Sequence, residues 1–399
     1  MAQSFVLAGL RTPIGNFGGG LASTRAPELG ACLVREFINR EVCAPDQVDQ
    51  VIFGNVLQAG LGMNPARQAA VRGGMPYEVP AYTVNMVCAS GLYSILLGDQ
   101  TIRHGQARTV IAGGFENMSR APRALLNSRW GNSLGHEQVA DLVLMDGLWD
   151  VFYDRHMANT VESLVRRYGI SREEQDKFAL ESHRKAVAAL QTGKFNDEIV
   201  PVQVDGQELK HDERPRADTS LEKLAVLKPV FDAKGTITAG NASGLNDGAA
   251  AVVLSDRRIR VKEAICAEIV GSALVAVDPV DMGIAPVFAI KKLLAETKLD
   301  FEDIGLWEIN EAIAGQVLCV LKELPIPTDR LNVNGGAVAL GHPIGCSGAR
   351  ILVTLLHEMK RREVELGVAA LCVGGGLGLA VLVRNMGEGC TLVSVRQGP

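Results

Sequence analysis

The chain has 399 residues, which is long for one simple core and predicts two or three domains. Hydrophobic residues make up 47% of the sequence and charged residues 21%, as in an ordinary globular protein. The formal charge of −5 at pH 7 argues against nucleic acid or an anionic membrane surface as the main partner.

The sequence also predicts a location. No apolar run reaches the roughly 18 residues that a membrane helix needs. A strand is expected over residues 4–8, which leaves no room for a signal or transit peptide. The eight cysteines have no regular spacing and include no Cys-x-x-Cys pair, so we expect free thiols in a reducing compartment. The cytoplasm is the predicted location.

Strands and helices alternate over the first 120 residues. Short buried strands are expected at 51–56 and 109–114, and helices at 27–38 and 92–103. This alternation is typical of an α/β fold. Glycines 18–20 follow no buried strand and have no acidic partner at dinucleotide-binding distance, so they predict a loop.

One stretch of this first part, Thr83 to Gly91, points to chemistry. An apolar strand stops at Cys88, small residues follow, and a helix then begins. Unpaired backbone amides and the dipole of a helix favour negative charge at its N-terminus, which would lower the pKa of the thiol and make it a nucleophile. The alternative is that Cys88 is a small buried hydrophobic residue.

The residue pattern changes over residues 121–246, where strand-like apolar runs become rare. Ser171 and Glu174 form a capping box for a helix whose residues 178, 182, 186 and 190 share one face. We expect an inserted segment that leaves the sheet and carries substrate contacts. The apolar strand at 249–255 then returns to the first core.

The last part of the chain repeats the order of elements of the first. Strands are expected at 267–277, 305–309, 368–373 and 377–383, with helices at 286–296 and 348–360. The strands at 368–373 and 377–383 predict a hairpin around a glycine turn, and residues 385–399 predict a loose tail. The predicted domains are therefore 1–120 with 247–265, the insertion 121–246, and 266–399.

Three further motifs lie at predicted strand ends or helix starts, where ligands of α/β sheets bind. They are Asn310-Glu311-Ala312, Gly341-His342-Pro343-Ile344-Gly345-Cys346-Ser347-Gly348 and Cys372-Val373-Gly374-Gly375-Gly376. The remaining histidines show no metal-ligand spacing, so no metal site is predicted. Those histidines are His104, His136, His183, His211 and His357.

Together with Cys88-Ala89-Ser90-Gly91, these motifs resemble the thiolase family in order and spacing. Residues 112–119 and 239–248 match as well, and the resemblance extends to about Arg384. It implies the thiolase α/β fold, in which two similar βαβαβαββ halves form a layered α-β-α-β-α core with an inserted loop domain.

The resemblance implies a reversible condensation of two acetyl-CoA to acetoacetyl-CoA and CoA, with no metal or redox cofactor. Cys88 would carry the acyl group, His342 would take the thiol proton, and Cys372 would remove a proton from the second acetyl-CoA. Asn310, through a water, and His342 would hold the enolate oxygen. The backbone amides of Cys88 and Gly374 would form a second oxyanion pocket.

The inserted segment resembles that of short-chain members of the family. The residues expected to shape the acyl pocket or contact CoA are Leu148, His156, Met157, Arg216, Phe231, Ser243 and Met282. The alternative for the apolar members of this set is ordinary core packing. A homo-oligomer, a tetramer built from two dimers, is implied by the resemblance alone.

Several positions depart from close short-chain relatives. Alanine replaces glycine at Ala89, Ala158 and Ala285, isoleucine replaces phenylalanine at Ile313, and Lys223 replaces serine. These changes concern acyl specificity more than chemistry. Two alternatives therefore stay open: a degradative 3-ketoacyl-CoA thiolase for longer chains, and a non-catalytic CoA-binding homologue.

Overall fold

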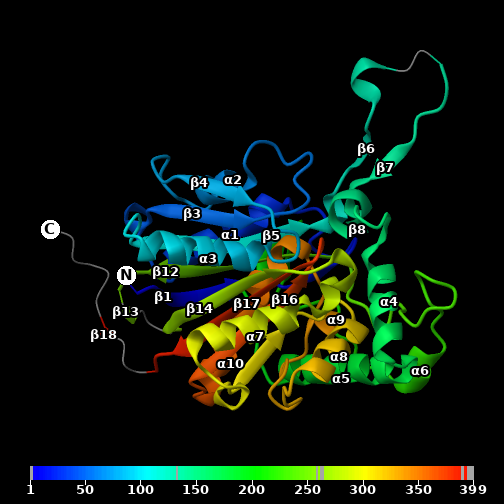
Figure 1. Cartoon of the computed structure of the whole chain (residues 1–399). Coiled ribbons are helices and arrows are strands. Elements are labelled where there is room, and N and C mark those ends of the chain that lie inside the picture. Colours follow the sequence, from blue (N-terminus) through cyan, green and yellow to red (C-terminus); the bar gives the residue numbers. More distant parts are fainter. Residues whose placement is uncertain (1–2, 132–133, 258, 261–264, 388–390, 393–399) are drawn as a thin grey trace.

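The computed structural model describes residues 3–131, 134–257, 259–260, 265–387 and 391–392. Its central element is a ten-stranded sheet, in the order β4-β3-β5-β12-β1-β14-β17-β16-β15, with β2 paired to β12 (Figure 1). These strands are β1 (Phe5–Arg11), β2 (Gly15–Asn16), β3 (Gln50–Gly54), β4 (Ala81–Val84), β5 (Thr109–Asn117), β12 (Asn246–Ser255), β14 (Ala267–Ala276), β15 (Leu306–Ile309), β16 (Leu366–Val373) and β17 (Leu377–Asn385).

The two halves of the sheet have the same topology. In the first half β4, β3 and β5 are parallel, and β12 and β1 follow antiparallel. In the second half β15 and β16 are parallel, β17 and β14 follow antiparallel, and Leu331 bridges Trp307 where a further parallel strand would lie. The halves join where β1 pairs with β14. The predicted pair of similar halves and the predicted 368–383 hairpin are confirmed.

Helices cover both faces of each half of the sheet. Helices α1 (Ala26–Asn39) and α2 (Pro65–Arg72) pack on the first half, and α7 (Ala285–Thr297) and α8 (Ala314–Glu323) on the second. Between the halves lie α3 (Ser90–Arg103) and α10 (Ile344–Arg362), which pack on each other. Helix α3 packs on strands of the first half, and α10 packs on strands of both halves. This is the predicted α-β-α-β-α layering.

The strand β12 shows why its sequence is continuously apolar. Side chains of successive strand residues point to opposite faces of a sheet. Ala251 and Val253 lie in the outer core cluster with α1, whereas Val252 and Leu254 lie in the central cluster with α3 and α10. Each fully buried valine or leucine contributes about 1.5–3 kcal/mol, so a strand covered on both faces is stabilised along its whole length.

The segment between β5 and β12 lies outside the main sheet. It contains the hairpins β6–β7 and β8–β9, the helices α4, α5 and α6, and the short pair β10–β11. In Figure 1 the β6–β7 hairpin projects away from the body, and α4 to α6 gather at one side. The predicted capping box of Ser171 and Glu174 is present at the start of α5. The bounds are β6 (Arg123–Leu125), β7 (Val139–Asp141), β8 (Trp149–Asp150), β9 (Arg155–His156), α4 (Met157–Tyr168), α5 (Arg172–Gln191), β10 (Val202–Val204), β11 (Gln207–Leu209) and α6 (Leu221–Ala225).

Short elements complete the described chain. They are η1 (Pro45–Gln47), η2 (Met118–Arg120), η3 (Ser128–Trp130), the π-helical η4 (Leu144–Leu148), η5 (Pro279–Ile284), η6 (Phe301–Asp303), α9 (Ala337–Leu340), β13 (Ile259–Arg260) and β18 (Thr391–Leu392). Because β18 pairs in parallel with β13, the predicted loose tail is wrong at these two residues. Residues 388–390 and 393–399 of that prediction lie outside the described residues. In the part of the chain that the structure describes, no helix is long and apolar enough to cross a membrane.

The cysteines differ from the expectation in one place. Six of the described cysteines are free: Cys32, Cys43, Cys88, Cys319, Cys346 and Cys372. Cys266 is disulfide-bonded, so the prediction of free thiols throughout is wrong at this residue. Cys390 lies outside the described residues.

Candidate active site

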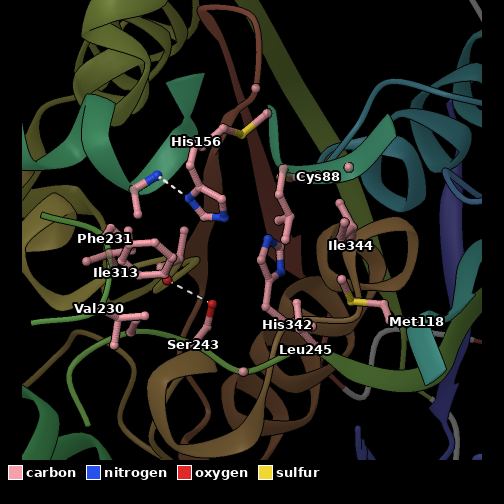
Figure 2. A pocket seen from close by; sticks show the side chains of 18 of the residues that line it. Cys88, Met118, His156, Val230, Phe231, Ser243, Leu245, Ile313, His342 and Ile344 are labelled. Carbon is pink, nitrogen blue, oxygen red and sulfur yellow. Dashed lines mark hydrogen bonds between the residues drawn. The ribbon is translucent and has the colours of Figure 1, made fainter. Parts of the chain in front are cut away.

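A cavity of about 390 Å³ lies where the inserted segment meets the carboxyl ends of the strands. Figure 2 shows Cys88, His156 and His342 directed into it from three different segments, with Phe231 and Ile313 on one side and Met118 and Ile344 on the other. Most residues that the sequence singled out line this cavity: Cys88, Leu148, His156, Met157, Phe231, Ser243, Met282, His342, Cys372 and Gly374.

The nucleophile candidate Cys88 sits on a sharp turn between β4 and α3. Val87, the residue before it, has φ of +46°. A β-branched residue rarely adopts this left-handed conformation, so the turn is strained. Its neighbours hold it: Asn85 Oδ1 accepts from the Val87 amide at 2.9 Å, and Ser90 Oγ donates to the Val87 carbonyl at 2.6 Å and accepts from the Met86 amide at 2.9 Å. The expected position of Cys88 just before a helix is confirmed.

The expected lowering of the Cys88 pKa by the start of the helix is wrong. Burial raises the pKa of the Cys88 thiol to about 11, although hydrogen bonds from the backbone amides of Gly374 and Cys88 lower it in part. Desolvation of a buried thiolate outweighs the favourable dipole at the helix start. Burial and the neighbouring Cys88 likewise raise the pKa of Cys372. Both thiols are therefore protonated at neutral pH.

This thiol state predicts the pH dependence of alkylation. The fraction of Cys88 that is thiolate at pH 8 is on the order of 10⁻³ for a pKa of about 11, and it rises tenfold per pH unit. The rate of Cys88 alkylation by iodoacetamide, followed by intact mass, should therefore keep rising from pH 7 to pH 10. A rate that levels off near pH 8 would show a thiolate–imidazolium pair instead.

His342 is held in one tautomer by Ser347. The Ser347 hydroxyl donates to the Pro343 carbonyl at 2.9 Å, so its oxygen must accept from His342 Nδ1 at 2.6 Å. His342 Nε2 is then unprotonated and can accept a proton. Burial, and to a lesser extent Arg350, lower the pKa of His342 to about 4. The imidazole is neutral at working pH, as a general base must be.

A buried carboxylate fixes the loop that carries His342. Glu116, at the end of β5, accepts from Asn55 Nδ2 at 2.6 Å and from the amides of Val56 at 3.0 Å, Leu57 at 3.1 Å and Gly345 at 2.9 Å. Gly345 lies in the first turn of α10, three residues after His342. Burial raises the pKa of Glu116 to about 7, although the hydrogen bonds from these backbone amides lower it in part. The motif around residue 116 thus joins the loop after β3 to the start of α10.

Gly374 packs where no side chain fits. A Cβ built on it would lie 2.2 Å from the Met157 methyl carbon and 3.4 Å from a Val87 methyl carbon. Its backbone therefore approaches both the strained turn and the Cys88 sulfur, which its amide contacts. The backbone amides of Cys88 and Gly374 therefore both reach the Cys88 sulfur.

Asn310 is fully buried and does not line the cavity. Its backbone amide bonds to the Ala370 carbonyl at 2.9 Å. Neither Oδ1 nor Nδ2 of its side chain has a partner among the described residues. A buried amide usually hydrogen-bonds to protein or ordered water. The side chain can therefore bind a water.

His156 and Phe231 form one wall of the cavity. Their rings stack with centroids 4.5 Å apart at 20°. His156 Nδ1 accepts from the Ala158 amide at 3.0 Å and caps α4, so a neutral His156 carries its proton on Nε2. Burial lowers the pKa of His156. The ring can thus donate one hydrogen bond into the cavity.

Of the five replaced positions, Lys223 is exposed and pairs with Asp218 at 2.7 Å, and the other four fall into two groups. Ala158 and Ile313 line the cavity. Ala89 is buried at the N-cap of α3, and Ala285 packs on the backbone of Gly378. Only the first pair can therefore alter the cavity shape directly.

Two predicted residues do not line the cavity, and several lining residues were not predicted. Asn310 is fully buried and Arg216 is exposed, and neither is a lining residue. Lining residues without an assigned role include Met118, Leu144, Gly147, Arg214, Val230, Thr238, Ala242, Gly244, Leu245, Ala312 and Ile344. Several lie inside the quoted motifs, which could have indicated them; Arg214 had no such signal. Within the described residues, no cluster of histidine, cysteine or carboxylate side chains could hold a metal ion.

Comparisons with known proteins agree with this geometry. Residues 4–258 match the family model "Thiolase, N-terminal domain" and residues 263–385 match "Thiolase, C-terminal domain". The acetyl-CoA acetyltransferase of Pseudomonas aeruginosa is 50% identical over 392 residues, covering 96% of this chain and all of that protein. That of Cupriavidus necator is 49% identical over 393 residues with the same coverage.

Solved structures resemble the chain equally well. The Bacillus anthracis acetyl-CoA acetyltransferase superposes with a TM-score of 0.92 and 44% identity, covering 97% of this chain and 99% of that one. Human mitochondrial 3-ketoacyl-CoA thiolase gives 0.92 and 41%, with 96% and 99% covered. The fold and the family match are those of an acyltransferase. The chain belongs to the thiolase family.

Proposed function

We propose that the protein is an acetyl-CoA C-acetyltransferase, which condenses two acetyl-CoA to acetoacetyl-CoA and CoA reversibly. The observation that carries the proposal is the meeting of Cys88, His342 and Cys372 in one cavity, with the amides of Cys88 and Gly374 at the Cys88 sulfur. The names of the relatives support the same substrate.

In the first half of the reaction, Cys88 attacks the thioester carbonyl of acetyl-CoA. His342 Nε2 accepts the thiol proton as the sulfur–carbon bond forms, and returns a proton to the departing CoA sulfur. The negative oxygen of the tetrahedral intermediate is held by the amides of Cys88 and Gly374. The high pKa of Cys88 means that base and attack must act together, since little thiolate exists beforehand.

In the second half, Cys372 acts as the base, after its own thiol proton has passed to His342 Nε2. A methyl proton beside a thioester is weakly acidic, and a thiolate whose pKa is strongly raised is a correspondingly strong base. The enolate oxygen accepts hydrogen bonds from the protonated His342 Nε2 and from a water on Asn310. The enolate carbon attacks the acetyl group on Cys88, and Cys372 gives the abstracted proton to the Cys88 sulfur as that bond breaks. His342 Nε2 then returns its proton to Cys372. No oxidation state changes, so CoA serves only as substrate and product.

The specificity proposed is for four-carbon substrates. Leu148, Met157, Met282 and Phe231 line the cavity and leave about 390 Å³ for acyl group and pantetheine together. The rival is a 3-ketoacyl-CoA thiolase for longer chains, because Ile313 stands where close relatives carry a larger ring and the human enzyme is structurally as similar. We propose that Ser243, which lines the cavity, and the exposed Arg216 contact CoA.

A chain-length series tests this proposal. Thiolysis of acetoacetyl-CoA and of 3-oxodecanoyl-CoA is measured with CoA on the purified full chain. We expect kcat/KM at least about 100-fold higher for the four-carbon substrate, since added methylenes that do not fit cost about 1–3 kcal/mol each. Equal or better cleavage of the longer chain would support the degradative rival. No turnover of either by folded protein would support a non-catalytic CoA-binding role.

We also propose a cytoplasmic homotetramer. The β6–β7 hairpin extends from the body and carries exposed Leu126, Trp130 and Leu134, the last two 92% and 95% exposed (Figure 1). Exposed large apolar side chains on a projecting element favour burial against another copy. Analytical ultracentrifugation of the wild type and of a Trp130→Ser, Leu134→Ser variant would test this, with dissociation expected for the variant.

A further inference from the structure

Arg214 is an unusual member of the cavity wall. Among the described residues that line the cavity, it alone carries a permanent charge. Its Nε donates to the Val338 carbonyl at 3.1 Å and its Nη2 to the Ala242 carbonyl at 3.0 Å. Its Nη1 has no partner in the part of the chain that the structure describes. Two hydrogen bonds to backbone carbonyls therefore hold the Arg214 guanidinium in place, and its Nη1 group remains open to a ligand.

The two fully buried arginines in the described part of the chain face carboxylates. Arg11 pairs with Glu198 at 2.6 Å and with Asp212 at 2.7 Å, and Arg350 lies 3.6 Å from Glu308. Arg214 makes no ion pair with any described residue, and the charged group that acts on it is Arg216. A largely buried charge without a counter-ion is costly and is retained where a ligand supplies the opposite charge.

Arg214 also lies close to the catalytic loop. A Cβ built on Gly244 would be 2.6 Å from Arg214 Nη1 and 3.0 Å from Asn246 Oδ1. Asn246 Oδ1 accepts from the His342 backbone amide at 3.0 Å. Glycine at 244 therefore keeps open the space in front of Arg214 Nη1. This space is next to Asn246, whose side chain holds the backbone of His342.

We propose that Arg214 is a specificity residue that binds an anionic oxygen group of the substrate, a carboxylate or a phosphate. The proposal rests on the proposed function, because it assigns a ligand group to the same cavity. A carboxylate would come from the far end of a dicarboxylic acyl chain, a substrate beyond the proposed four-carbon one, and a phosphate from CoA. Either anion can form a charge-assisted hydrogen bond with Nη1.

Binding measurements separate these sources without turnover. Calorimetry is run in the Cys88→Ala background, in which acyl transfer is absent. Three proteins are compared: one that keeps Arg214, one with Arg214→Met and one with Arg214→Lys. The probes are CoA, pantetheine, butyryl-CoA and the CoA thioester of glutarate, which ends in a carboxylate. Arg184→Met removes an exposed cation of α5 as the matched control.

Loss of Arg214 should weaken an anionic probe by at least about tenfold, as for one hydrogen bond to a charged group. If the phosphate is the anion, Arg214→Met weakens all CoA probes and leaves pantetheine unchanged. If the carboxylate is the anion, it weakens the glutaryl thioester and leaves butyryl-CoA unchanged. Lysine should restore part of either loss, and the control should change none.

A second variant protects the test against a folding defect. Gly244→Ala keeps the charge and fills the space before Nη1, so it should produce the same selective loss. The proposal is overturned if Arg214→Met and Gly244→Ala weaken pantetheine as much as they weaken the CoA probes. It is also overturned if the two variants weaken no probe. Failure of the proposed function would instead appear as wild-type protein that binds these probes and does not cleave acetoacetyl-CoA.

Discussion

Alanine in place of Cys372 is expected to stop condensation while Cys88 is still acylated, whereas alanine in place of Cys88 should stop both steps. Turnover should fall at least about 10⁴-fold in either variant, because groups that act as a unit are each indispensable. The difference lies in the half-reactions. Cys88 holds the acyl group, and Cys372 is needed only when a carbon–hydrogen bond is broken.

Intact mass after incubation with acetyl-CoA measures the first half-reaction, and acetoacetyl-CoA formation measures the whole. The matched control is Cys346→Ala, another buried free cysteine, which lies in α10 and does not line the cavity. It should lose little activity. Equal loss of acylation in the Cys88 and Cys372 variants would contradict the assigned division of labour.

The fold follows from the sequence because its signals are local. The continuous apolar run of β12 and the alternation of strands and helices indicate strands buried on both faces and crossover helices. The helix α10 was predicted to begin at residue 348 but begins at Ile344. Glycines at 345 and 348 weaken a helix signal, and only the packed structure shows that close contacts with the Glu116 carboxylate and with Leu92 require them.

The pKa values and charge pairing of the site are harder to predict from the sequence than the fold is. Helix position alone predicted a lowered pKa for Cys88, because a sequence shows the helix start but not the depth of burial. Arg214 was missed for a related reason. Its pairing state depends on carboxylates that approach from distant segments, as Glu198 and Asp212 approach Arg11, and no local pattern reports their absence.

Substitution of His342 by alanine is the second change with a large expected effect. Because the same Nε2 takes the Cys88 proton and faces the cavity in both half-reactions, acylation and condensation should each fall about 10²–10⁴-fold. Ser347→Ala keeps the imidazole but removes the acceptor of its Nδ1 proton. It should cost roughly tenfold, the value of one hydrogen bond.

The pH profile distinguishes these effects from a loss of packing. The folded pKa of His342 is lowered from 6.5 to about 4, so its neutral, active form persists until the pH falls toward 4. In the wild type, kcat/KM should therefore show no acid limb from His342 between pH 6 and 7. Ser94→Ala on α3 is the control, since it removes a buried serine that bonds to two backbone carbonyls and touches no histidine. If Ser94→Ala lowers acylation as much as Ser347→Ala does, Ser347 acts through packing. If only Ser347→Ala lowers it, the hydrogen bond to Nδ1 sets the tautomer that catalysis requires.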